Sequence, residues 1–216
     1  MIGFYNYSVI LTYLGLGLSI FGMKEAIVGM TEVPNSETHF LLAVLCLALA
    51  GACDTFDGKV ARAMKNRSKE AGIFGVQIDS LCDLVCFGVF PAIFAYCLGM
   101  RGTLGVVILI LYVLGAVIRL AFFNVLDEQK RYAPPTDEKK SYRGLPVTTI
   151  SMIFPILFLF RGQLPKELFI TTLTFVMLAV AFLFVLDFKI RKPSNQMIAV
   201  FIVFIAIVML KVLGVF

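Results

Sequence analysis

The chain has 216 residues, of which 60% are hydrophobic and 15% are charged, and its mean hydropathy is +0.93. This composition is too apolar for an ordinary soluble domain and excludes that class. The formal net charge of +5 is modest. It gives no reason to expect a nucleic-acid partner, because basic loops beside anionic lipid explain it more simply.

Apolar segments of about 20 residues, each long enough to cross a bilayer, recur along the whole chain. The fifth is shorter than the others and begins at Pro146, so it is either a full span or a re-entrant piece. We therefore predict an all-α, polytopic integral membrane helix bundle with about seven transmembrane segments, six to eight being compatible with the pattern, in which residues 1–216 form a single domain. The expected segments are 4–29, 38–64, 71–99, 102–127, 146–161, 167–187 and 196–215.

Basic residues gather in alternate loops, after the second, fourth and sixth segments. The loops on the other side hold only Arg101, Arg161 and Lys166. The positive-inside rule then predicts that the N-terminus and the three basic loops face the cytoplasm, in the cell membrane. The basic residues of these loops are Lys65, Arg67, Lys69, Lys130, Arg131, Lys139, Lys140, Arg143, Lys189, Arg191 and Lys192.

Four aspartates lie on the second and third segments, Asp54 and Asp57 on one and Asp79 and Asp83 on the other. A charged aspartate at the centre of a bilayer costs about 2.5–3.5 kcal/mol on insertion, so four of them need compensating partners. Residues three or four apart share a helix face, and two helices can therefore direct all four carboxylates at one pocket. Oxygen ligands of this kind suit Mg²⁺ or Mn²⁺, and two such ions can clamp a diphosphate.

The residues beside these acids leave room for a ligand. Gly58, Ala61 and Arg62 continue the helical stripe of the first acid pair, and Gly75 lies one turn before the second pair. Small side chains let a ligand approach the backbone closely. Arg62 and Lys65 supply positive charge for a phosphate group.

The pattern DxxDGxxAR followed by GxxxDxxxD resembles the signature of the CDP-alcohol phosphatidyltransferases. Twelve residues, 63–74, separate its two halves, more than is usual in that family, and we expect the extra turn in the loop between the two helices. The signature positions are filled here by Asp54, Asp57, Gly58, Ala61, Arg62, Gly75, Asp79 and Asp83.

The resemblance implies an enzyme of phospholipid biosynthesis that joins a CDP-linked lipid to an alcohol and releases CMP. It implies a divalent metal cofactor, Mg²⁺ or Mn²⁺, with two ions held by the four aspartates, and a homodimer. Gly58, Ala61, Arg62 and Gly75, together with Asp57, are then expected beside the CDP-lipid. Asp83 is the candidate general base.

Three further stretches resemble the bacterial phosphatidylserine synthases of this family. They are SLCDLVCFGVFPA (80–92), RLAFFNV (119–125) and YRGLP (142–146). This resemblance implies that the substrates are CDP-diacylglycerol and L-serine. Acceptors such as glycerol 3-phosphate or inositol phosphate stay open, as does a different class, a cation transporter that uses intramembrane carboxylates.

The carboxylate of serine requires a cation, and guanidinium groups bind carboxylates in a bidentate manner. Phe122 stands where the similar enzymes carry an arginine, so either Arg119 or Arg143 takes that role or the role is absent, with Asn124 as a weaker candidate. Arg119 lies inside an apolar segment, where ionisable groups are functional candidates. The alternative for Arg119 is a salt bridge to one of the four acids.

Two residues near the start of the chain, Asn6 and Thr12, are candidates for the nucleotide side of the site, with Lys65. The alternative is that Asn6 lies at the membrane interface and that the Thr12 hydroxyl bonds its own helix backbone.

Overall fold

A computed structural model describes residues 7–31, 33–63, 68–132 and 142–190 of the chain. Within these ranges the regular structure is helical apart from one pair of two-residue strands, and short turns connect the helices. The principal helices are α1 (Tyr7–Thr31), α2 (Ser36–Ala63), α3 (Lys69–Asp83), α4 (Phe90–Leu98), α5 (Thr103–Tyr132), α6 (Ile150–Leu159) and α7 (Lys166–Val185). A π-helical segment, η2 (Leu84–Val89), joins α3 to α4, and short 3₁₀ turns are formed by η1 (Val33–Asn35) and η3 (Val147–Thr149).

The described helices confirm the predicted all-α membrane bundle. Five of its helical stretches are long and apolar enough to cross a membrane, and a shorter apolar helix covers Val147–Leu159. Large apolar side chains point outward from their flanks, among them Leu104, Phe175 and Phe182, as expected for surfaces in contact with lipid. The predicted segment 196–215 lies outside the described residues, so the total number of spans stays a prediction.

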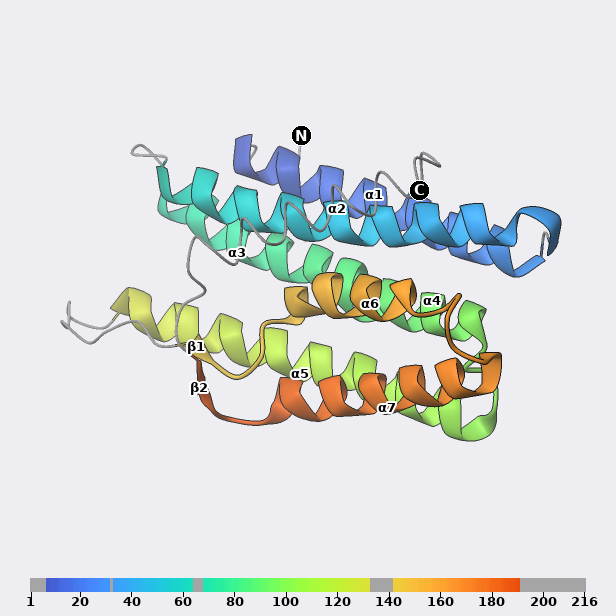
Figure 1. The fold of residues 1–216 in the computed structure, drawn as a ribbon. Helices are drawn as coiled ribbons and strands as arrows, with labels where there is room; N and C mark the ends of the chain where they lie inside the picture. The colour runs from blue at the N-terminus through green and yellow to red at the C-terminus, as the bar shows by residue number, and fades with distance from the viewer. Residues whose placement is uncertain (1–6, 32, 64–67, 133–141, 191–216) are drawn as a thin grey trace.

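Successive spans run in alternating directions along a common axis, with α3, η2 and α4 forming one span (Figure 1). The turns between α1 and α2, α4 and α5, and α6 and α7 lie at one end of the bundle. The other end carries the start of α1, the end of α2, the start of α3 and the end of α5. There β1 (Tyr142–Arg143) pairs antiparallel with β2 (Lys189–Ile190), so the segment before α6 is tied to the segment after α7.

An aromatic cluster holds α2, α4 and α6 together in the core. Phe94 of α4 is fully buried and its ring centroid lies 4.9 Å from that of Phe154 and 6.0 Å from that of Phe158, both on α6. Phe40 of α2 and Phe90 at the start of α4 complete the cluster, with centroids 6.0 and 6.1 Å from Phe94. Stacked rings add a directional preference to the burial of their apolar area, so this cluster fixes how α4 is rotated in the bundle.

Helix α1 packs closely on α2 and α4 at Gly22. A Cβ atom at this position would come within 2.4 Å of the Phe90 ring and 2.8 Å of Cys46 Cβ. Only glycine therefore permits this approach.

A buried ion cluster ties α1 to α2 near the end that carries their connecting turn. Glu25 is only 3% exposed, and its two carboxylate oxygens lie 2.6 Å from Lys24 Nζ and 2.6 Å from His39 Nδ1. His39, the single histidine of the chain, thus has a structural partner far along α2 from the acid pair. A buried carboxylate needs such partners, because an unpaired charge in an apolar bundle is strongly destabilising.

Candidate metal and substrate site

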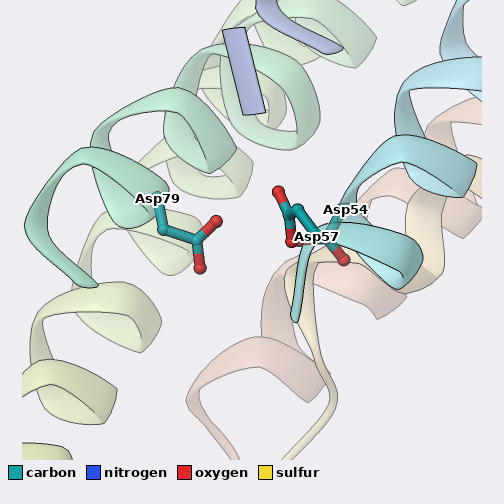
Figure 2. A group of neighbouring side chains, drawn as sticks. All are labelled: Asp54, Asp57 and Asp79. Atoms are coloured by element: carbon teal, nitrogen blue, oxygen red, sulfur yellow. The ribbon is translucent and has the colours of Figure 1, made fainter. Parts of the chain in front are cut away.

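Three of the four aspartates form a close cluster between α2 and α3. Carboxylate oxygens of Asp54, Asp57 and Asp79 all lie within 4.8 Å of one another. Figure 2 shows Asp79 on α3 facing Asp54 and Asp57 on α2. Three negative charges at this separation repel one another, and a divalent cation between them would attract each carboxylate and offset that repulsion. The all-oxygen donor set fits Mg²⁺ or Mn²⁺.

The fourth aspartate, Asp83, lies one turn beyond Asp79 at the end of α3. Its carboxyl group lies close enough to those of Asp54 and Asp79 to interact with them electrostatically. Asp83 is not part of the three-residue cluster, but it lines the same pocket as Asp54 and Asp57. Its position beside the cluster leaves it able to act on a group bound there.

The pocket lies between α1, α2 and the α3–η2 junction. Thr12 contributes from α1, and its Oγ1 donates a hydrogen bond of 2.8 Å to Oδ2 of Asp57. Both side chains are buried, at 8% and 5% exposure. The Thr12 hydroxyl therefore contacts the acid cluster, and it does not bond only the backbone of its own helix, which was the alternative. The pocket is lined by Leu11, Thr12, Gly15, Ala50, Cys53, Asp54, Asp57, Cys82, Asp83, Cys86 and Phe87.

The remaining residues of the signature follow the acids along the same two helices. Gly58 is half-buried directly after Asp57, and Gly75 lies on α3 one turn before Asp79. Ala61 and Arg62 belong to the last turn of α2, with side chains outside the described part of the chain. The candidates Asn6 and Lys65 also lie outside the described residues.

The spacing between the signature halves includes the end of α2 and the start of α3. Helix α2 extends to Ala63 and α3 begins at Lys69, while residues 64–67 lie outside the described part of the chain. Ser68 caps α3, and its Oγ accepts a 3.1 Å hydrogen bond from the Ala71 amide. The expectation of an extra turn in the loop therefore stays a prediction.

Arg119 is buried on α5, with only 6% of its surface exposed. Its Nε donates a 3.1 Å hydrogen bond to the Leu145 carbonyl, and its guanidinium lies 5.4 Å from the ring centroid of Phe123. Its Nη1 is buried without a hydrogen-bond partner among the described residues. The acid that acts on it electrostatically is Asp187, after α7, and not one of the four pocket acids. This disfavours the alternative of a salt bridge between Arg119 and one of the four aspartates.

A glycine turn brings the chain alongside Arg119. Gly144 has a φ of 70°, a left-handed conformation that side chains disfavour, and its amide donates a 2.7 Å hydrogen bond to the Phe188 carbonyl. A Cβ atom there would lie 3.5 Å from Arg119 Nε. The neighbouring Arg143 is in β1, with its side chain outside the described part.

Asn124 connects α5 to α3 beside the acids. Its Oδ1 accepts a 2.7 Å hydrogen bond from the hydroxyl of Ser80, the residue after Asp79. Sequence reasoning did not single out Ser80, since a serine within an apolar segment carries no distinguishing pattern. Phe122, in contrast, is 42% exposed on the flank of α5 and points away from this contact.

Comparison with known proteins identifies the family. The CDP-alcohol phosphatidyltransferase model matches residues 5–170, which is more than half of the chain. The chain belongs to this family. It is an integral membrane protein, and enzymes of this family use a divalent metal.

Several curated relatives share part of the sequence. The chain is 38% identical over 132 residues to a CDP-diacylglycerol–serine O-phosphatidyltransferase of Saccharomyces cerevisiae, covering 60% of this chain and 46% of the relative. An enzyme with the same name from Helicobacter pylori is 29% identical over 138 residues, covering 62% of this chain and 54% of the relative. Another from Mycobacterium bovis is 33% identical over 129 residues, covering 58% of this chain and 43% of the relative. The chain thus spans about half the length of the curated relatives it matches. No solved structure matches it.

The hydrogen bond from Thr12 to Asp57 yields a prediction. Thr12→Val preserves the shape of the side chain but removes the donor, so the Asp57 carboxylate loses the contact that orients it. Loss of such an outer contact typically weakens metal binding about 10- to 100-fold. Titration of the purified protein with Mn²⁺, followed by electron paramagnetic resonance, measures the effect. Thr172→Val is the matched control, because the Thr172 hydroxyl donates to the Leu168 carbonyl of its own helix and to no other atom of the described residues. Equal Mn²⁺ affinity in the two variants would contradict the orienting role.

Proposed function

We propose that the protein transfers the phosphatidyl group of CDP-diacylglycerol to the hydroxyl of L-serine, giving phosphatidylserine and CMP. The observation that carries the proposal is the cluster formed by Asp54, Asp57 and Asp79 at one end of a membrane bundle of this family. The names of the matched relatives, together with the stretches 80–92 and 142–146, favour serine as the acceptor.

In this proposal Asp54, Asp57, Asp79 and Asp83 hold two divalent ions, Mg²⁺ or Mn²⁺. When bound, the ions supply positive charge that neutralises the diphosphate and the departing CMP. The fit rests on the donor chemistry, because carboxylates within 4.8 Å of one another offer only oxygen ligands and an excess of negative charge. Thr12 would hold Asp57 in its orientation.

The CDP-lipid would lie along the end of α2 and the start of α3. Gly58, Ala61 and Gly75 place no bulky side chain there, and Arg62 would bind a phosphate. Asn6 and Lys65 complete the nucleotide side in this proposal. The acyl chains would leave the site sideways into the bilayer, since the flanks of the bundle are apolar.

Asp83 is the proposed general base. It would take the proton of the serine hydroxyl as the serine oxygen forms its bond to the β-phosphorus, while the bond from that phosphorus to the oxygen of CMP breaks. Its place beside the cluster, in the pocket that Asp54 and Asp57 also line, supports this assignment. A carboxylate near cations is a weak base, so the step depends on a well-placed and polarised hydroxyl.

Arg119 is the proposed partner of the serine carboxylate, with Asn124 and Arg143 nearby. A buried guanidinium nitrogen without a partner is costly, and a carboxylate ligand would satisfy it. Asn124 lies next to the acid cluster through Ser80, so α5 can present a cation and an amide to the same small substrate.

We further propose that residues 1–216 work as one domain in the cytoplasmic membrane, as a homodimer, with the acid-bearing end facing the cytoplasm. The arrangement of charge supports this orientation, because the basic loops follow the ends of α2, α5 and α7. These three helix ends lie at the same end of the bundle (Figure 1).

The acceptor is tested directly by measuring CMP release. Purified protein with CDP-diacylglycerol and Mg²⁺ or Mn²⁺ should release CMP when serine is added, and chelation of the metal should abolish the release. Parallel reactions contain glycerol 3-phosphate or inositol phosphate in place of serine. CMP release with one of these and not with serine would contradict the proposed acceptor, and release with no alcohol would contradict it as well.

Replacement of Asp83 tests the proton transfer. Asp83→Asn should lower kcat at saturating serine and metal by at least about 100-fold, which is the usual contribution of a general base. Binding of CDP-diacylglycerol should largely survive. Glu128→Gln, an exposed change on α5, is the control and should leave kcat unchanged. Near-normal turnover in Asp83→Asn would show that another group takes the proton.

Replacement of Arg119 tests the serine site. Arg119→Ala should raise the KM for serine by about 10- to 100-fold, as expected for the loss of a charge-assisted hydrogen bond worth about 1.5–3 kcal/mol. The KM for CDP-diacylglycerol should change much less. Arg101→Ala serves as the control, because Arg101 donates to the Tyr96 and Cys97 carbonyls at the opposite end of the bundle. An unchanged serine KM in Arg119→Ala would place the carboxylate site elsewhere.

A further inference from the structure

The membrane span that carries Asp79 and Asp83 is not one continuous α-helix. It covers Glu70–Leu98, and its α-helical hydrogen bonding is interrupted by the π segment η2 directly after Asp83. At the end of this segment the Phe90 amide bonds the Val85 carbonyl, five residues back. A π turn holds more residues than an α turn, so it changes the rotation of the helix after it relative to the helix before it.

Pro91 explains why the wide turn occurs at this place. Proline has no amide hydrogen, and its ring clashes with the carbonyl four residues earlier, here that of Phe87. The Phe87 carbonyl therefore lacks the donor that an α-helix would give it. A buried carbonyl left in this state costs free energy comparable to a lost hydrogen bond.

Tyr112 supplies the missing donor from another helix. It lies on α5, is fully buried, and its hydroxyl donates a 2.5 Å hydrogen bond to the Phe87 carbonyl. Its ring packs against Phe184 of α7, with centroids 5.4 Å apart, so the hydroxyl is held in a fixed place. The contact joins residues 25 positions apart in the chain.

The half of the span after the π turn, α4, is held in place by the core, so a change in the turn would move the half that carries Asp79 and Asp83. After the wide turn, Phe90 and Phe94 are locked in the aromatic core, and Phe90 packs directly on Gly22. If the π turn relaxed to an α-helix, the two halves of the span would rotate relative to each other by about 100°, the rotation of one residue. Because α4 is held by the core, α3 would have to make this rotation. That rotation would carry Asp79 and Asp83 away from Asp54 and Asp57.

We infer that Tyr112 is a positioning residue for the metal site: its hydrogen bond to the Phe87 carbonyl stabilises the π turn that holds Asp83 and Asp79 against the acids of α2. The inference rests on the proposed metal binding. It assigns Tyr112 no contact with substrate or ions.

The test compares Tyr112→Phe with Tyr96→Phe in the full chain, purified in detergent. The first change removes the buried hydroxyl and keeps the ring, and the second removes an exposed hydroxyl from the same span as the acids. Tyr112→Phe should raise the Mn²⁺ dissociation constant by about tenfold, the scale of an outer-sphere effect on a metal site. Tyr96→Phe should leave it unchanged. An unchanged constant in Tyr112→Phe overturns the inference, whereas absence of Mn²⁺ binding in the wild-type protein would overturn the proposed metal site instead.

A second readout separates positioning from general loosening. Cys82 on α3 and Cys97 on α4 are both buried, at 5% and 4% exposure, and lie on either side of the π turn. In Tyr112→Phe, alkylation by N-ethylmaleimide, resolved by mass spectrometry, should accelerate at Cys82 and not at Cys97. This readout does not require metal. Equal acceleration at both cysteines would mean that Tyr112 only stabilises the bundle, and it would overturn the inference.

Pro91→Ala provides a further comparison, because an amide at residue 91 gives the Phe87 carbonyl another donor when the turn takes the α-helical register. If Tyr112 acts through that carbonyl, the change Tyr112→Phe should alter the Cys82 alkylation rate less in the Pro91→Ala background than in the wild-type background. An equal effect in both backgrounds would show that Tyr112 acts by another route.

Discussion

Mutual repulsion among three carboxylates is the constraint around which this bundle is built. Asp54, Asp57 and Asp79 bring like charges within 4.8 Å of one another between two membrane helices. An apolar surrounding strengthens this repulsion, and it also strengthens the attraction of any cation that enters. The arrangement therefore makes sense as a site for divalent metal, and the proposed transfer to serine uses the charge that such ions bring to a diphosphate.

Contacts from other parts of the chain converge on this cluster. Thr12 of α1 donates to Asp57, Ser80 beside Asp79 is tied to Asn124, and Tyr112 of α5 meets the π turn behind Asp83. Each contact comes from a helix that holds none of the four aspartates. The geometry of the acids is thus a property of the packed bundle, and not of α2 and α3 alone.

The sequence predicted the helices and the grouping of the acids well, because both depend on local periodicity. Apolar runs fix the spans, and spacings of three and four place aspartates on one helix face. It could not predict the π turn, because Pro91 and Tyr112 are linked only through tertiary packing. The Ser68 cap at the start of α3 was not predicted either, because a serine within a polar loop gives no strong helix signal.

The central claim is that Asp54, Asp57 and Asp79 are held together to bind divalent ions. Anomalous X-ray scattering from crystals of the protein grown with Mn²⁺ tests it most directly. The predicted result is a manganese peak between the α2 and α3 carboxylates, within bonding distance of all three. Crystals in which the three carboxylates are separated and no manganese lies near them would contradict the claim.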